Sequence, residues 1–263
     1  MSDILLLATD LDGTLVGNGE RPEQYRAFRD IVYRLRRTLG SKWAIVTGRH
    51  ERSMRRALNQ LSIHGLIPDF LVLEDARIFR RRSSGRYSSF FWWNFSVDRR
   101  RRRLRKRYYP QIRTWRRELT ARFPETDDLS VAGSDLWLRF PHEEAVGMAV
   151  AFLREQTDGD SCLEVFHWGT EVYLAPTAGC KGDAVERICR RLKVPPACAF
   201  AVGDGANDVS MLNGAVVGMP ACVGNAIPEV REAVRLAEGY EASGSGLTGV
   251  LEALERYLPD ALR

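Results

Sequence analysis

The sequence predicts an α/β fold class: a doubly wound parallel sheet with helices on both faces and a smaller α/β domain inserted into it. Continuous apolar runs such as Ile4–Leu7 and Trp43–Val46 are typical of strands buried on both faces. Amphipathic segments alternate with these runs, and the order β-α-β-α-β favours parallel strands joined by right-handed crossovers. The composition then becomes basic and serine-rich from Arg80 to Ser89, which marks the start of the inserted domain.

The remaining core elements can be placed by the spacing of their apolar residues. A helix is predicted from Arg21 to Leu39, where apolar side chains recur at three- and four-residue spacing. Gly40 is suited to end this helix. The other core elements are predicted as helices at His50–Leu61, Lys181–Leu192, Pro228–Ala233 and Leu247–Leu258, and as strands at Phe70–Leu73, Phe200–Val202 and Val216–Met219.

Two domains are expected. Residues 1–82 and 177–263 would form the core domain, and residues 83–176 the inserted one. Within the insertion an apolar stripe at helical spacing runs from Val97 to Leu119, with a kink or break expected around Pro110. Further predicted elements are strands at Leu136–Phe140, Leu163–Phe166 and Glu171–Leu174, and a helix at His142–Arg154.

The charge of the chain is unevenly distributed. Its 263 residues, of which 44% are hydrophobic, can build a sizeable core, and the net charge is +5. Between Arg77 and Arg122, however, sixteen Arg and one Lys stand against Asp98 and Glu118, so this segment carries +15 and the rest carries −10. Such asymmetry indicates either an anionic partner or a solvated helix face.

Neither a membrane segment nor a disulfide scaffold is expected. No apolar run approaches the ~20 residues of a membrane helix, and the N-terminus lacks the basic region of a signal peptide. The five cysteines are scattered without Cys-x-x-Cys spacing, so the sequence predicts neither a zinc site nor a disulfide framework. We therefore expect a cytoplasmic protein with reduced thiols.

Two acidic loops follow apolar strands. Asp10 and Asp12 come directly after the first strand, and positions i and i+2 of an extended chain point the same way. Asp204 and Asp208 follow the strand at Phe200–Val202, with glycines that allow a tight turn. Carboxylates gathered at one edge of a sheet repel each other unless a cation relieves them, and their oxygens suit Mg²⁺.

Two further positions favour phosphate binding. Thr47 and Gly48 end the second strand, where a hydroxyl and backbone N–H groups can face a phosphate. Lys181 stands at the start of a predicted helix, so its ammonium adds to the positive end of the helix dipole. Each of these features alone is common in ordinary turns and helix starts, and their order along the chain makes the pattern specific.

This order resembles the haloacid dehalogenase superfamily. Asp-Leu-Asp-Gly-Thr from Asp10, Val-Thr-Gly-Arg ending at Arg49, Lys181-Gly182 and Gly-Asp-Gly-x-Asn-Asp from Gly203 are similar to its four motifs. The insertion lies between the second and third motifs, as in the Cof-like and sucrose-phosphate phosphatase-like branch with a large α/β cap. The resemblance implies a Rossmann-like core and an Mg²⁺-dependent phosphatase, a hydrolase acting on phosphoric monoesters of small metabolites.

The resemblance also implies residue roles. Asp10 would be the nucleophile that forms an aspartyl-phosphate, and Asp12 the general acid and base. The implied phosphate-binding residues are Thr47, Gly48, Lys181 and Asn207, the implied metal ligands are Asp10, Asp12, Asp204 and Asp208, and weak substrate candidates in the cap are Trp168, Thr170 and Glu171. One departure is Leu73–Arg77, where many relatives carry an Asn-Gly or Gly-Thr turn.

The substrate is expected to be a sugar phosphate or phosphorylated glycoside. Two alternatives remain open: a phosphomutase with the same residues, and a protein that binds nucleic acid or another polyanion through the arginine-rich segment, with a vestigial core. Intact acids in both loops argue against a vestigial core, so a nucleic-acid partner is not expected. For Arg99–Arg103 we favour a solvated face, because five consecutive arginines spread around a helix. The sequence predicts no oligomeric state.

Overall fold

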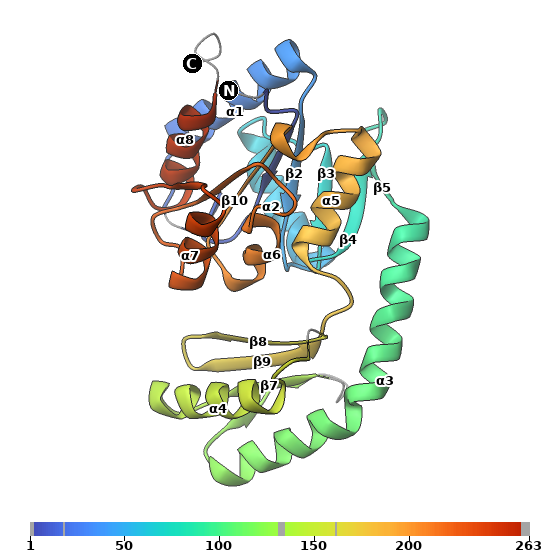
Figure 1. Ribbon diagram of the computed structural model, residues 1–263, viewed down its shortest axis with the longest axis vertical. Helices are drawn as coiled ribbons and strands as arrows, with labels where there is room; N and C mark the ends of the chain where they lie inside the picture. Colours follow the sequence, from blue (N-terminus) through green and yellow to red (C-terminus); the bar gives the residue numbers. More distant parts are fainter. Residues whose placement is uncertain (1–2, 18, 131–134, 161, 259–263) are drawn as a thin grey trace. The chain divides into compact units, whose positions relative to one another are not determined.

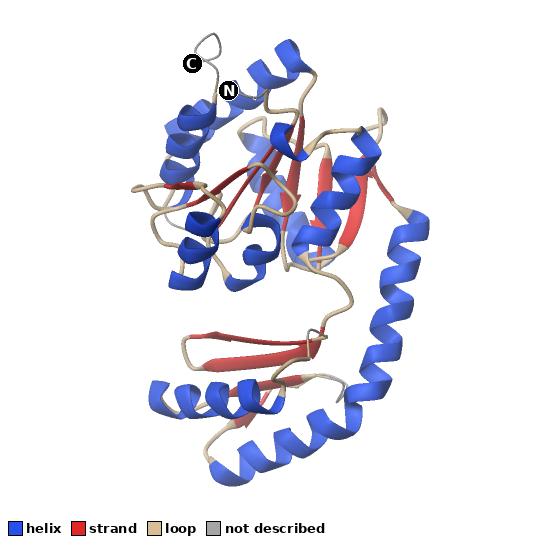
Figure 2. Ribbon diagram, viewed as in Figure 1, coloured by secondary structure: helices blue, strands red, loops and turns tan. Residues whose placement is uncertain are grey.

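The computed structural model describes residues 3–17, 19–130, 135–160 and 162–258. It divides into two compact units. The first comprises Met1–Asn94 and Gly179–Arg263, and the second comprises Phe95–Ala178. Each unit has its own sheet, so the two are described separately (Figures 1 and 2).

The first unit is built on an eight-stranded sheet with the strand order β12-β11-β10-β1-β2-β3-β4-β5. The strands from β12 to β3 are parallel, and β4 and β5 extend the sheet as an antiparallel edge. The strands are β1 Leu6–Thr9, β2 Lys42–Val46, β3 Phe70–Leu73, β4 Arg77–Arg81, β5 Tyr87–Ser89, β10 Ala199–Gly203, β11 Met219–Cys222 and β12 Tyr240–Glu241.

Helices cover both faces of this sheet, which confirms the predicted doubly wound α/β fold. Successive residues of β1 face opposite cores: Leu7 packs with one face, whereas Leu6 and Ala8 pack with the other. The first core takes side chains from α1 Pro22–Leu39, α2 Glu51–Ile63 and α8 Gly246–Tyr257; the second takes them from α5 Lys181–Leu192, α6 Val209–Leu212 and α7 Pro228–Leu236. Short 3₁₀ turns lie at Pro196–Cys198 and Ala206–Asp208.

The second unit contains a four-stranded antiparallel sheet of order β6-β7-β9-β8. Its strands are β6 Asp127–Asp128, β7 Leu136–Arg139, β8 Leu163–Trp168 and β9 Glu171–Pro176, and its helices are α3 Phe91–Arg122, which begins in the first unit, and α4 Glu143–Gln156. The predicted stripe of α3 is buried, from Val97 to Leu119. Pro110 lies inside α3, and Figure 2 shows this helix bent along its length.

Two sequence-based boundaries differ from the structure. The start of the insertion was expected at residue 83, but β5 lies beyond it and pairs with β4 in the first unit's sheet. A strand was expected at Val216–Met219, but β11 begins only at Met219, where it pairs with Phe200. Val217 is buried without being part of a strand, so its apolar character misled the prediction. In the described ranges, no helix is both long and apolar enough to cross a membrane.

Two helical glycines make a matched test of the packing. A Cβ on Gly182 in α5 would lie 2.1 Å from the backbone oxygen of Ser210, whereas a Cβ on Gly147 in α4 would meet no atom within 4 Å. Gly182→Ala should therefore lower the free energy of unfolding by about 2 kcal/mol through overpacking. Gly147→Ala should raise it by about 0.5–1 kcal/mol, because alanine restricts the unfolded chain. Urea denaturation measures both, and equal effects would contradict the packing of α5 against α6.

Candidate active site

The motif residues meet at the carboxyl edge of the first unit's sheet. Asp10 follows β1, Thr47 follows β2 and Asp204 follows β10, and these three strands are adjacent and parallel. Parallel strands end at the same edge, so side chains distant in the sequence come together there. The backbone N–H of Asp10 donates to the carbonyl of Val202 at 2.9 Å, which continues the β1–β10 pairing to this edge.

A buried ammonium group joins two of the loops. Lys181, the first residue of α5, donates from Nζ to Asp10 Oδ1 at 2.5 Å and to Asp208 Oδ1 at 2.6 Å. The side chains of Lys181, Asp10 and Asp208 are exposed by only 1%, 7% and 0%. Ions so deeply buried are tolerated when they are paired and hydrogen-bonded, so this cluster fixes the start of α5 against the ends of β1 and β10.

The second acidic loop folds around Asp208. Its other oxygen, Oδ2, accepts the backbone N–H groups of Asp204 and Gly205, each at 2.9 Å. A Cβ on Gly203 would lie 2.4 Å from Asp208 Cγ, so only glycine leaves room for the carboxylate. The glycines of this motif therefore allow the aspartate to turn back on its own backbone and reach Lys181.

The first acidic loop contacts the second at Asp204. Thr14 Oγ1 donates to Asp204 Oδ1 at 2.6 Å, and Asn225 Nδ2 donates to Asp204 Oδ2 at 3.3 Å. Gly13 has a φ of +79°, and a Cβ there would lie 2.3 Å from Asp204 Oδ2. Glycine at this position thus satisfies both the left-handed backbone and the close approach of the two loops.

Three carboxylates share this site with one ammonium. Burial raises the pKa of Asp10 well above its usual value against the pull of Lys181, and Asp208 raises it further. Burial also raises the pKa of Asp204 to about 6, and the hydrogen bond from Thr14 opposes this rise. Burial alone would lower the pKa of Lys181, but the carboxylates of Asp10 and Asp208 outweigh it and the net shift is upward. Negative charge is therefore in excess here.

The donor set fits a hard divalent cation. Asp10, Asp204 and Asp208 each offer a carboxylate oxygen, and these oxygens lie within 4.8 Å of one another. Oxygen ligands with excess negative charge are those that Mg²⁺ prefers. A cation between them would offset the repulsion from Asp208 and Asp204, which adds to the rise that burial gives the pKa of Asp10.

Asp12 is not among the three grouped carboxylates, although its charge helps to raise the pKa of Asp204 after burial and Asp208. Both of its oxygens accept from Arg49, from Nε at 2.8 Å and from a terminal nitrogen at 2.5 Å, and its side chain is 51% exposed. We expected Asp10 and Asp12 to point the same way along a strand. The strand ends at Thr9, however, so both residues lie in a loop, where the alternation of an extended chain does not hold.

The predicted phosphate-binding residues gather beside the acidic loops. The hydroxyl of Thr47 is buried and accepts the backbone N–H of Arg49 at 3.1 Å. Asn207 Nδ2 donates to Asp75 Oδ1 at 2.9 Å, and a Cβ on Gly48 would lie 3.6 Å from Asn207 Nδ2. Thr47, Gly48 and Asn207 therefore lie on neighbouring loops of one edge.

Sequence reasoning missed Asp75 as a site residue. It follows β3, and both Glu74 and Asp75 have left-handed backbones, with φ of 50° and 61°. Such angles strain residues other than glycine and occur often near functional sites. The signal was present in the departure at Leu73–Arg77, because an Asn-Gly turn accepts the same backbone without strain. Thr14, Arg49 and Asn225 were also given no role, although each lies within or beside a motif.

The substrate candidates belong to the second unit. Glu171 Oε2 accepts from Trp137 Nε1 at 2.8 Å, and Glu171 Oε1 pairs with Arg139 at 2.8 Å. The carbonyl of Thr170 accepts the backbone N–H of Phe140. The side chain of Trp168 lies outside the described part of the structure. The substrate role of these three residues stays a prediction.

Comparisons with known proteins agree with the motif pattern. Residues 154–251 match a family model described as haloacid dehalogenase-like hydrolase, and residues 4–78 match one described as sucrose-6F-phosphate phosphohydrolase. YkrA of Bacillus subtilis, a candidate phosphatase, is 26% identical over 252 residues, which span 88% of this chain and 90% of that protein.

Solved structures share the fold over nearly the whole chain. The sucrose-phosphatase of Synechocystis, solved with sucrose and phosphate, has a TM-score of 0.65 and 21% identity, with 97% of this chain and 98% of that chain covered. The sugar phosphatase BT4131 of haloacid dehalogenase subclass IIB has a TM-score of 0.58 and 16% identity, with 96% and 98% covered. Together the two family models and the relatives support a haloacid dehalogenase-like phosphatase that is similar to sucrose-phosphatase.

Proposed function

We propose that this phosphatase hydrolyses a phosphorylated small molecule in two steps, with Asp10 as nucleophile and Mg²⁺ as cofactor. The observation that carries the proposal is the carboxylate of Asp10, buried at the end of β1, bonded to Lys181 and grouped with Asp204 and Asp208. These three carboxylates are the residues that would hold the metal. When bound, Mg²⁺ supplies positive charge that offsets repulsion between the carboxylates and a phosphoryl group.

In the first step, an oxygen of Asp10 attacks phosphorus in line with the leaving oxygen. The phosphorus–oxygen bond of the substrate breaks, and the phosphoryl group is carried by Asp10 as an aspartyl-phosphate. Asp12 donates a proton to the leaving oxygen. Because both oxygens of Asp12 accept from Arg49 in the structure, Asp12 acts as the acid only after one oxygen has left Arg49 and taken up the proton that is then donated.

In the second step, water attacks the phosphorus of the aspartyl-phosphate. Asp12 takes a proton from this water, phosphate departs and the carboxylate of Asp10 is restored. In both steps the equatorial oxygens of the transferred phosphoryl group need hydrogen-bond donors. Lys181 has three N–H groups, and among the described residues two of them donate to Asp10 and Asp208, so the third can donate to a phosphoryl oxygen. The hydroxyl of Thr47, the amide of Asn207 and the backbone around Gly48 would supply the others.

A sugar phosphate or phosphorylated glycoside is the substrate class we propose. The match of residues 4–78 to the sucrose-6F-phosphate phosphohydrolase model supports it, as does the fold shared with two sugar phosphatases. A screen of phosphorylated metabolites that follows phosphate release, with Mg²⁺ and then with a chelator, tests it. Isomerisation of the substrate without phosphate release would favour a phosphomutase instead.

Replacement of the nucleophile should abolish turnover. Asp10→Asn keeps the shape of the side chain, but an amide neither attacks phosphorus nor binds a cation well, so kcat should fall by several orders of magnitude. Asp30→Asn changes an exposed aspartate of α1 and serves as the matched control. Thermal melting should show both variants folded. Activity of Asp10→Asn above about a tenth of the parent's would contradict the assignment.

The metal-free protein should lose stability as pH rises toward neutrality. The pKa of Asp204 is about 6 in the folded state and lies above its unfolded value, so the folded protein holds this proton more tightly. The stabilisation is full below about pH 4 and is lost as pH rises through about 6. In a chelator at pH 7.5, Asp204→Asn should therefore melt a few degrees above the parent, and this advantage should vanish at pH 4.

The same variant tests the metal site. Added Mg²⁺ should raise the melting temperature of the parent at pH 7.5, because the metal binds only the folded protein. It should not raise that of Asp204→Asn, whereas Asp30→Asn should respond like the parent. Equal stabilisation of Asp204→Asn and the parent by Mg²⁺ would show that Asp204 is not a ligand.

The arginine run of α3 should not select the substrate. Arg99, Arg100 and Arg103 are exposed, and replacing all three with Gln should leave KM for the best small substrate within about threefold. Steady-state kinetics with kcat monitored in parallel measure this. A rise of KM of more than about tenfold with unchanged kcat would assign the run to substrate recognition.

A further inference from the structure

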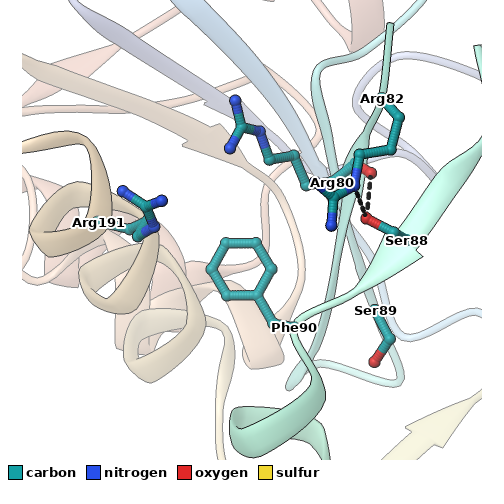
Figure 3. A pocket seen from close by; sticks show the side chains of 6 residues that line it. All are labelled: Arg80, Arg82, Ser88, Ser89, Phe90 and Arg191. Carbon is teal, nitrogen blue, oxygen red and sulfur yellow. Dashed lines mark hydrogen bonds between the residues drawn. The ribbon is translucent and has the colours of Figure 1, made fainter. Parts of the chain in front are cut away.

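A cavity lined by arginines lies in the first unit, on the β4–β5 edge of the sheet. It measures about 180 Å³ and is lined by Arg80, Arg82, Ser88, Ser89, Phe90 and Arg191 (Figure 3). Arg80 pairs with Phe70, the first residue of β3, whereas Asp75 follows the last residue of β3. The cavity therefore lies at the end of the sheet opposite the proposed catalytic residues.

The fold explains why these arginines converge. Ile78 of β4 is buried with Ile188 of α5, and alternate positions of a strand share one face. Arg80 is the next residue on the face that Ile78 occupies, and Arg82 follows it. Arg191 lies in the last turn of α5, which covers that face. Beyond the contact between Ile78 and Ile188, β4 and α5 therefore both carry arginines. Figure 3 shows the guanidinium groups of these arginines around the ring of Phe90.

The lining has the chemistry of an anion site. Arg82 Nε donates to Ser88 Oγ at 2.6 Å, and Ser88 Oγ lies 3.4 Å from the carbonyl oxygen of Arg80, so the serine orients one guanidinium. The lining residues include three cations and no carboxylate. Phe90 forms an apolar wall and is held edge-to-face against Phe70, with ring centroids 6.1 Å apart.

We propose that this cavity binds a small polyphosphate, an anion with two or more linked phosphate groups. Each guanidinium presents paired N–H donors that match two phosphate oxygens, so three of them can engage more oxygens than one phosphate group offers. The volume equals that of about six water molecules, which suits a diphosphate group and is too small for a folded partner. The site is separate from the catalytic residues and does not depend on their proposed roles.

Titration calorimetry with inorganic pyrophosphate in a chelator tests the proposal. The full-length parent should bind one pyrophosphate, with an affinity that falls as salt is raised. Arg80→Gln and Arg191→Gln should each weaken binding by at least about tenfold, because each removes a charged donor pair. Arg187→Gln changes an exposed arginine of the same helix that does not line the cavity, and it should bind like the parent.

A second set of measurements separates this site from the catalytic one. Asp10→Asn should bind pyrophosphate as the parent does, and Arg80→Gln should keep the parent's kcat with p-nitrophenyl phosphate and Mg²⁺. The proposal is overturned if the parent does not bind pyrophosphate, in which case the arginines only protect the sheet edge. It is also overturned if binding survives in both arginine variants but is lost in Asp10→Asn.

Discussion

The ammonium of Lys181 between the carboxylates of Asp10 and Asp208 is the interaction on which the first unit's site depends. It joins the start of α5 to the end of β1 and to the loop after β10, and all three side chains are almost fully buried. A charge at such depth is stable only with its partners, so removing the ammonium leaves two buried carboxylates without a counterion. Gly203 leaves room for the carboxylate of Asp208 in this cluster, and Gly13 leaves room for the neighbouring carboxylate of Asp204.

The excess of negative charge in this group of carboxylates is what suits the site to a cation. One ammonium does not neutralise three carboxylates, and burial sharpens the repulsion that remains. In the proposed function, Lys181, Thr47 and Asn207 at the same edge would donate to an anion. A site that accepts a cation and a phosphoryl group side by side is what transfer to a carboxylate requires, because the cation offsets the repulsion between attacking and transferred oxygens.

Sequence patterns predicted the site residues whose positions follow from their own strand or helix. Asp10, Asp204 and Lys181 stand at strand ends or a helix start, and apolar runs place those ends reliably. The rest depends on tertiary approach. Asp75 reaches Asn207 only because Glu74 and Asp75 adopt strained left-handed angles. The β5 strand joins the core sheet through pairing with β4, although its composition is that of a linker. The arginine cavity needs β4 and α5 to meet, which neither segment shows by itself.

The stability of Lys181→Met in a chelator is the most direct test of the central cluster. Methionine fills similar space without charge, so Asp10 and Asp208 would have to be buried together without a counterion. Urea unfolding at pH 5 and pH 8 should show a loss of about 3–5 kcal/mol that is larger at pH 8, because protons relieve the two carboxylates only at low pH. A loss that is small, or equal at both pH values, would contradict the role given to this ammonium group.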